Sequence, residues 1–308
     1  MAVSSGRILC VGALTMDTIF RLDRLPAGPG KVIPLDAAEV AEGMAAAQAA
    51  SIARLGGQAA LWASAGDDAT GDRLVAQIEA EGVDCSRVRR VPGGRSGFSS
   101  IFMDRTGSTM IVPRYDPDLT SAPAAAPDLA GFAAVMTDVR WPDAAALALA
   151  AASASNIPAI LDADMASADI LHRLVPLATH IVASESAACL ITGAPTPEAA
   201  ARALLGTARF VAVTAGAEGC WWSDDGAIRH TPAPRIDAID TLAAGDVFHA
   251  AFALRLVEGA PMADTIAFAS AAAAIKCTRF GGRLGCPSRG EVEAFLSSGT
   301  TEQDKTSS

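Results

Sequence analysis

A regular alternation of short apolar runs with longer Ala-rich segments constrains the fold of this chain more than any other feature. The runs at 8–14, 59–65, 133–137, 159–163, 180–183 and 210–214 are apolar at most positions. Such runs are typical of strands buried on both faces of a parallel sheet. Helices are predicted at 45–55, 71–81, 143–153, 170–177, 196–205, 246–258 and 262–276. The alternation predicts an α/β fold with a doubly wound, mostly parallel sheet flanked by helices.

Two segments depart from this pattern. Residues 17–40 alternate apolar and polar side chains and contain a cluster of Pro and Gly, and residues 95–115 contain a predicted hairpin around 105–107. Half-exposed strands of this kind are expected to pair into a small β lid beside the main sheet. We therefore predict one domain over 1–297, with lid segments at about 17–40 and 95–115, followed by a polar, disordered tail at 298–308.

Composition excludes several classes of partner. The chain has 308 residues, of which 51% are hydrophobic and 19% charged, and its net charge is −10. A nucleic-acid or anionic-membrane surface needs basic patches, so neither partner is expected. The six cysteines lack metal-binding spacing, and the short polar stretch before the first strand has no signal-peptide character, so we expect reduced thiols and a cytoplasmic location.

The segment Asp-Thr-Leu-Ala-Ala-Gly-Asp at 240–246 carries the chemistry. Small residues allow a tight turn, and the run that follows Asp246 has a helical pattern. Unpaired amides at a helix N-terminus form an anion site, and a carboxylate in the same turn would lie beside the bound anion. These are the two parts that phosphoryl transfer needs, namely donors for the phosphoryl charge and a base for the attacking hydroxyl. The alternative is that Asp246 is an ordinary helix N-cap.

This segment resembles the D-T-x-G-A-G-D signature of the ribokinase-like (PfkB) carbohydrate kinases, with Ala243 in place of the first Gly. Three further stretches resemble motifs of the same family and occur in the same order. They are Cys10-Val11-Gly12 through Asp17, Gly66-Asp67-Asp68 with Gly71, and Val213-Thr214-Ala215-Gly216 with Gly219. The resemblance covers nearly the whole chain and implies a ribokinase-like fold, ATP as phosphoryl donor, magnesium and a homodimer.

The resemblance also implies roles for individual residues. Asp246 would be the catalytic base, and the amides of Ala243, Ala244 and Gly245 would hold the transferring phosphoryl group. Asp17 would bind sugar hydroxyls, unless it is only an Asp at the end of a strand. Thr214, Gly216, Gly219, Ser270 and Ala273 would line the nucleotide site.

Two positions depart from the family pattern. The sugar-binding Gly-Gly element is Glu42-Gly43 here, so only Gly43 keeps its role and ribose becomes a less favoured substrate. In the segment that orders magnesium through water, only Glu185 offers a carboxylate. Magnesium is still expected because it bridges the β- and γ-phosphates of ATP, with Glu185 as an indirect contact.

A closer resemblance is to the sulfofructose kinases, which implies 6-deoxy-6-sulfofructose as the sugar and its 1-phosphate as the product. A sulfonate is a permanent anion and needs dedicated cations. Lys31 on the lid and Arg140 after a parallel strand are candidates, although each could be a surface charge. A polar position expected in this branch is Pro113 here, and the following Arg114 is a substitute anion contact. The matching stretches are 30–31, 138–141, 161–164, 247–249, 268–270, 276–279 and 281–283.

The sequence leaves other functions open. The alternatives within the same class are a fructokinase or ketohexokinase and a sugar-phosphate kinase, with a nucleoside kinase less favoured. A catalytically silent sugar-binding protein is the alternative from a different class, but such a protein has no need of Asp246. His249, which follows the signature, is interpreted as a packed or supporting residue.

Overall fold

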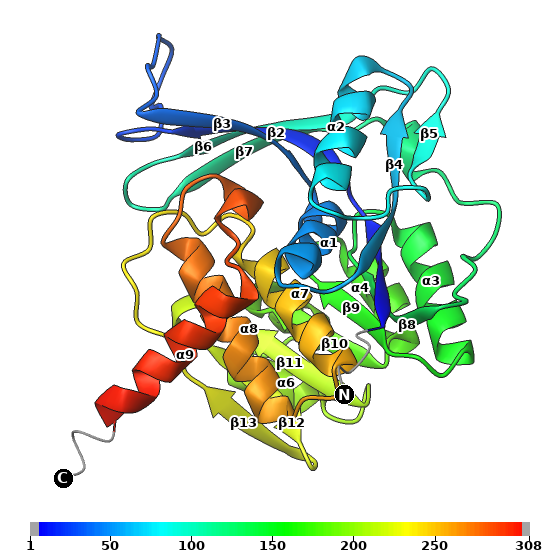
Figure 1. Cartoon of the computed structure of the whole chain (residues 1–308), viewed down its shortest axis with the longest axis vertical. Helices are drawn as coiled ribbons and strands as arrows, with labels where there is room; N and C mark the ends of the chain where they lie inside the picture. Colours follow the sequence, from blue (N-terminus) through cyan, green and yellow to red (C-terminus); the bar gives the residue numbers. More distant parts are fainter. Residues whose placement is uncertain (1–5, 304–308) are drawn as a thin grey trace.

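The computed structural model describes residues 6–303 and contains, over that range, a nine-stranded sheet and a separate four-stranded sheet (Figure 1). The order of the large sheet is β13-β12-β11-β10-β9-β8-β1-β4-β5, and the strands from β11 to β5 pair in parallel. These strands are β1 (Arg7–Gly12), β4 (Ala59–Gly66), β5 (Arg89–Val91), β8 (Phe132–Thr137), β9 (Ala159–Ala163), β10 (His180–Ser184) and β11 (Phe210–Thr214). The predicted doubly wound α/β fold is confirmed.

An antiparallel hairpin extends this sheet at one edge. It consists of β12 (Cys220–Asp224) and β13 (Ala227–Thr231) and was not predicted. The sequence contains a signal for this hairpin, the Asp225-Gly226 pair between the two strands. Both residues adopt a positive φ in the structure. An Asp-Gly pair of this kind is a typical two-residue hairpin turn.

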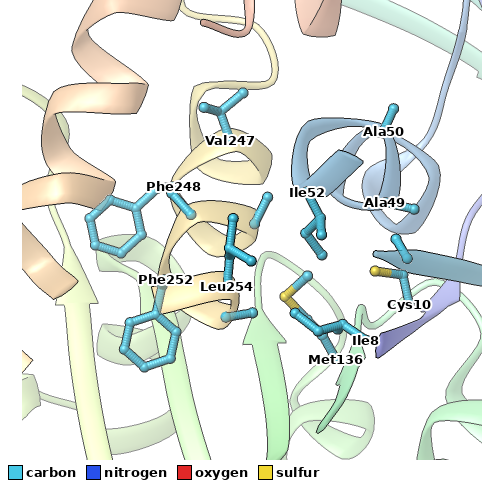
Figure 2. Close-up of a cluster of buried hydrophobic side chains, with 14 of the residues drawn as sticks. Ile8, Cys10, Ala49, Ala50, Ile52, Met136, Val247, Phe248, Phe252 and Leu254 are labelled. Atoms are coloured by element: carbon cyan, nitrogen blue, oxygen red, sulfur yellow. The ribbon is translucent and has the colours of Figure 1, made fainter. Parts of the chain in front are cut away.

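Helices cover both faces of the large sheet. One group of helices packs against one face of the sheet and forms a core that contains Ile8, Cys10, Met136 and Phe252, as Figure 2 shows. The other group packs on the opposite face around Leu9, Val11 and Leu161. The first group is α1 (Met44–Arg54), α2 (Ala69–Ala80), α7 (Ala244–Val257), α8 (Met262–Cys277) and α9 (Arg289–Gln303). The second is α3 (Pro142–Ala154), α4 (Ala168–Leu174), α5 (Glu185–Thr192) and α6 (Pro197–Leu204).

The four-stranded sheet is the predicted lid. Its order is β3-β2-β6-β7, with β2 (Thr15–Arg21) paired parallel to β6 (Gly97–Met103) and antiparallel to β3 (Asp36–Glu42). The outer strand is β7 (Thr109–Arg114). A small cluster of buried side chains on the inner face of the lid sheet packs against Leu242 and Phe280. The lid therefore contacts the turn that precedes α7.

Differences from the predicted elements lie mainly at the ends of the chain and in short helices. Helices α5 and α9 were not predicted, and α9 continues to Gln303, so residues 298–303 of the predicted tail belong to a helix. The last five residues of that tail lie outside the described residues. No helix among those described is long and apolar enough to cross a membrane, and all six cysteines are free thiols.

Candidate active site

A pocket of about 550 Å³ lies beside the N-terminus of α7. It brings together five residues that the sequence predicted to line a nucleotide, although they come from the end of β11 and from α8. These are Thr214, Gly216, Gly219, Ser270 and Ala273, and Ala244 and Gly245 of the signature turn also line the pocket. Its walls carry few charges, as a site for an adenine ring and its ribose requires.

One wall of this pocket was not predicted from the sequence. Ala233, Pro234, Arg235, Ile236 and Ala238 come from the irregular segment between β13 and the signature turn. This segment has no periodic pattern and no motif, so nothing in it pointed to a binding role. Its place in the chain was the available signal, because it joins the nucleotide hairpin directly to the signature turn.

The signature turn presents unpaired amides. Among the described residues, the N–H groups of Ala243, Gly245 and Asp246 have no acceptor, whereas the N–H of Ala244 donates to the carbonyl of Thr241 at 3.2 Å. The amide of Ala244, which was expected to hold phosphate, is thus partly used within the turn. Ala243 is the N-cap of α7 and has a left-handed φ of 59°. The N-cap is therefore not Asp246, which removes the simplest structural explanation for that carboxylate.

A buried ion pair fixes the shape of this turn. The carboxylate of Asp240 accepts hydrogen bonds from the amides of Leu242, Gly281 and Gly282 at 2.7–3.0 Å. The ammonium of Lys276, fully buried like the side chain of Asp240, lies 3.1 Å from that carboxylate and donates to the carbonyl of Asp240 at 2.7 Å. Two buried charges are stable only when paired and fully hydrogen-bonded, as they are here.

Asp246 lies in the first turn of α7, half-buried, where its carboxylate faces α1 and the end of β9. The side-chain amide of Gln48 lies 3.5 Å from its Oδ1. Burial, followed by the negative charge of Asp162, raises the pKa of Asp246 well above its ordinary value, and the charge of His249 opposes this shift. A carboxylate with a raised pKa, next to unpaired amides, has the properties of a general base for a hydroxyl group.

Asp17 lies on the lid strand β2 and is buried. Its carboxylate accepts a hydrogen bond from the hydroxyl of Thr15 at 3.0 Å, and the hydroxyl of Ser99 on β6 also bonds to it. Burial raises its pKa, and these two bonds lower it. A buried carboxylate among hydroxyl groups is well suited to accept hydrogen bonds from a sugar.

Gly43 connects the lid to α1. It is the N-cap of α1, and its φ of 97° belongs to the left-handed region that glycine tolerates. A β-carbon at this position would lie 2.7 Å from the carbonyl carbon and oxygen of Ala13, so no larger residue fits. The neighbouring Glu42 is buried, and its carboxylate accepts a hydrogen bond from the amide of Arg283 at 2.7 Å. Burial raises the pKa of Glu42 to about 8.

Asp138 organises the loops on the sugar side and was not predicted as a site residue. Its buried carboxylate accepts hydrogen bonds from the amides of Ala13, Ala45 and Arg140 at 2.7–3.1 Å. It thereby joins the loop after β1, the first turn of α1 and the loop after β8. Gly12 permits this approach, since a β-carbon there would lie 2.1 Å from the carboxylate.

The three predicted cations do not form one cluster. Arg140 lines a small second pocket together with Thr15, Gly97 and Tyr115, but its guanidinium is bound to Asp164 at 3.1 Å and to the carbonyl of Met165 at 2.8 Å. Arg114, at the end of β7, lies 4.0 Å from Asp116. Lys31 is exposed on the loop between β2 and β3, with no partner among the described residues.

Glu185 is exposed at the first position of α5, directly after β10. The preceding Ser184 pairs with Thr214, so Glu185 follows a strand that borders the nucleotide pocket. Within the described part of the chain no group of three acidic, His or Cys side chains could hold a metal. The residues present therefore fit a magnesium ion held mainly by phosphate oxygens and water, with at most one protein carboxylate nearby.

Fold and site together define a class of protein. A pocket with few charges ends at unpaired amides of a helix N-terminus, and a carboxylate in the same turn faces Gln48 on α1, the helix that follows lid strand β3. This is the arrangement of an enzyme that transfers a phosphoryl group from a nucleotide to a hydroxyl.

Comparison with known proteins identifies the family. Residues 5–289 match the pfkB family carbohydrate kinase model, so the chain belongs to this family and is an ATP-dependent sugar kinase. It is 29% identical over 299 residues to the ribokinase of Bacillus subtilis, covering 94% of this chain and 100% of that protein.

Solved structures agree with this assignment. A putative ribokinase from Agrobacterium tumefaciens is 44% identical, with a TM-score of 0.91 and coverage of 95% of this chain and 98% of that one. A putative ribokinase II from E. coli, solved with ATP and Mg²⁺, shares the fold at 19% identity and a TM-score of 0.79, covering 95% and 99% of the two chains. These three relatives are named as ribokinases, and none of them is named a sulfofructose kinase.

Proposed function

We propose that this enzyme transfers the γ-phosphoryl group of ATP to a primary hydroxyl of a sugar, with Asp246 as the general base. The observation that carries the proposal is the position of Asp246. It lies one residue after Gly245, whose position lines the nucleotide pocket, and its carboxylate faces Gln48 on α1, the helix that begins where the lid strand β3 ends.

Each group then has a defined task. Asp246 takes the proton of the sugar hydroxyl, and the hydroxyl oxygen forms a bond to the γ-phosphorus as the bond to the β-phosphate oxygen breaks. The unpaired amides of Ala243, Gly245 and Asp246 stabilise the negative charge on the transferring group. Magnesium, when bound with the nucleotide, neutralises charge on the phosphates, and Glu185 is its nearest candidate contact from the protein, through water. The products are ADP and a sugar phosphate.

The sugar we propose is a ketose with an anionic end, namely 6-deoxy-6-sulfofructose, which would give its 1-phosphate. Support comes from Arg140, which lines the small pocket beside Thr15 on the lid side. Arg114 at the end of β7 and Lys31 on the lid loop supply further positive charge around the lid. Because Arg140 is already bound to Asp164, a sulfonate would have to share this guanidinium or displace the carboxylate.

A second candidate substrate is a neutral sugar such as ribose or fructose. A neutral sugar is favoured by the buried carboxylates on the proposed sugar-binding side of the site. They belong to Asp17, Asp138 and Asp162, which are all nearly inaccessible to solvent. Carboxylates accept hydrogen bonds from hydroxyl groups and repel anions. The names of the relatives also favour ribose.

Assembly and location follow from the same kinase assignment. The strand β7 at the edge of the lid exposes Met110, Ile111 and Val112, and Phe98 is exposed on the neighbouring β6. An exposed apolar edge strand favours pairing with another chain, so we propose a homodimer that joins through the lid. A molar mass of one chain by light scattering would contradict the proposed homodimer.

We place the reaction in the cytoplasm, where ATP is present and the six thiols stay reduced.

The experiment that tests the function is an ADP-release assay with purified protein and a panel of acceptors. The panel contains sulfofructose, fructose, ribose, fructose 6-phosphate and a nucleoside, each compared by kcat/KM. Sugar-dependent ADP release that disappears in Asp246→Asn is the expected result. Absence of ADP release with every acceptor would contradict the proposal and leave a sugar-binding protein as the alternative.

A further inference from the structure

Behind Asp246 lies a buried polar network that phosphoryl transfer, as described above, does not use. Gln48 on α1, Asp162 on β9 and His249 on α7 are each at least 97% inaccessible to solvent. The amide nitrogen of Gln48 lies 2.6 Å from Oδ2 of Asp162 and 3.5 Å from Oδ1 of Asp246. The other oxygen of Asp162, Oδ1, lies 3.2 Å from Nε2 of His249.

The surroundings of the His249 ring define which form fits. Its Nδ1 lies 2.7 Å from the carbonyl oxygen of Gly245, and its Nε2 lies 3.1 Å from the carbonyl oxygen of Val182 as well as near Asp162. Carbonyl oxygens only accept hydrogen bonds, so a proton on Nδ1 donates to Gly245. The other side of the ring lies against Asp162, where burial raises the pKa of the carboxyl well above its ordinary value. The ring thus joins the turn that contains Gly245 to the side chain of Asp162.

Gln48 is fully buried on α1 and makes polar contacts through one end of its amide. Its amide nitrogen bridges two carboxylates from different elements, while its Oε1 has no hydrogen-bond partner among the described residues. Leaving a buried carbonyl oxygen unpaired is unfavourable, on the order of 1–3 kcal/mol. The amide therefore combines an unfavourable unpaired oxygen with a nitrogen that links Asp162 to Asp246.

We propose that His249, Asp162 and Gln48 are positioning residues for the general base, with His249 holding Asp162 and Asp162 directing the Gln48 amide at Asp246. This rests on the proposed function of Asp246. Through Gly245, whose carbonyl bonds to the ring, His249 also holds the turn that carries the phosphate-binding amides. One imidazole therefore contacts both parts of the reaction centre, the base through Asp162 and Gln48, and the amide turn directly.

The network also sets the charge around Asp246. Asp162 raises the pKa of Asp246 and His249 lowers it, and Asp138 and Asp164 add smaller contributions that raise it. Glu42 at the end of β3 is another carboxylate close enough to interact with Asp246. Arg140 is the cation that faces Asp138 and Asp162 from the loop after β8. Removal of Asp162 or His249 therefore changes the ionisation of the base in opposite directions.

The test is the pH profile of kcat/KM with the best acceptor found for the wild type. In His249→Gln, which removes the positive charge, the acid limb is expected to move to higher pH, because the base loses its proton less readily. In Asp162→Asn, which removes the negative charge, the acid limb moves to lower pH. His172→Gln on the exposed face of α4 is the matched control and leaves the profile unchanged. Shifts in the same direction, or no shift in Asp162→Asn, overturn the proposal.

Gln48→Met separates positioning from stability. The substitution removes the unpaired Oε1 but also the donor to Asp162, so the two effects oppose each other and the melting temperature should change little. The kcat should fall by about ten- to a hundredfold because the base is less well aligned. The KM for ATP should not move, since Gln48 does not line the nucleotide pocket. An unchanged kcat in a stable Gln48→Met protein would assign these residues to structure alone. This variant also carries the test if His249→Gln does not fold.

An NMR measurement distinguishes failure of the network from failure of the kinase function. Long-range ¹H–¹⁵N spectra should show Nδ1 of His249 protonated in the wild type, as its 2.7 Å contact with the carbonyl of Gly245 requires. A ring that carries a proton on Nε2 alone overturns the network even in an active kinase. If the wild type phosphorylates no sugar, the proposed function fails, and a base-positioning role for the network fails with it.

Discussion

The two halves of the proposed active site differ in the groups that form them. The proposed nucleotide half consists of backbone amides and small residues, such as Gly216, Gly219 and Ala273, around a pocket with few charges. The proposed sugar half consists of buried carboxylates, namely Asp17 on the lid strand β2, Asp138 after β8 and Asp162 on β9. Backbone groups can bind a nucleotide that does not vary, whereas side chains can be exchanged without rebuilding the fold. We therefore expect substrate specificity to depend on the sugar half.

The largest effect is expected where the halves meet. Asp246→Asn removes the proposed base but preserves its size, so kcat should fall on the order of a hundredfold to ten-thousandfold, with little change in ATP or sugar binding. Steady-state kinetics and calorimetric binding measure both quantities. Near wild-type kcat would show that another group takes the proton.

The same substitution should not destabilise the protein. The folded state raises the pKa of Asp246, so ionisation of this carboxylate is less favourable in the folded than in the unfolded chain. The free energy of unfolding therefore falls as the pH rises above the ordinary pKa of an aspartate. Asn lacks this charge, so the melting temperature of Asp246→Asn at neutral pH should equal or exceed that of the wild type. A clear decrease would mean that the carboxylate has a structural partner that it needs.

The next effect tests how the nucleotide half is held. Lys276→Met leaves the carboxylate of Asp240 buried without its cation, which should lower the free energy of unfolding by about 3–5 kcal/mol. Urea denaturation gives the value, and Asp240→Asn in the same chain should restore part of it. Arg173→Ala, which breaks the exposed pair with Asp143, is the control and should change stability by less than about 1 kcal/mol. Equal effects would show that the Lys276 pair does not hold the turn.

The sequence predicted those groups that lie in contiguous motifs. The turn at 240–246 and the Gly residues after β11 are such motifs, and the structure brings them to one pocket. Contacts between distant positions were not predicted, because Gln48 and Asp162 are separated by 114 residues and the stretch 161–164 gave no role for Asp162. The lid strands were found from their alternating pattern. The short helix α5 was missed because eight residues carry too little periodicity.

A smaller effect decides which sugar the second half accepts. If Arg140 binds a sulfonate, Arg140→Ala should reduce kcat/KM for sulfofructose by about ten- to a hundredfold, since a hydrogen bond to a charged group contributes roughly 1.5–3 kcal/mol. Fructose, which has no charge at that end, should be much less affected, and the KM for ATP should not change. The experiment needs both sugars with the wild type, Arg140→Ala and Lys31→Ala. Equal loss for both sugars, or a wild type that prefers ribose or fructose, would exclude the sulfonate and leave the kinase assignment intact.

The smallest expected effect is the change in stability on replacing Ala243, which takes part in the proposed site through its backbone amide and not through its side chain. Ala243 has a left-handed φ of 59°, which is unfavourable for Ala by about 1–2 kcal/mol and easily adopted by Gly. Ala243→Gly relieves this strain but also adds freedom to the unfolded chain, which offsets about 0.4–1 kcal/mol. The net change should be a stabilisation of less than about 1 kcal/mol, with kcat unchanged because the amide keeps its place. Ala244→Gly, the same replacement at the first residue of α7, is the matched control and should destabilise the protein. Thermal denaturation of both variants measures the difference in sign. Destabilisation by both variants would mean that the methyl group of Ala243 makes packing contacts whose loss outweighs the relief of backbone strain. The turn would then depend on this side chain and not only on its backbone.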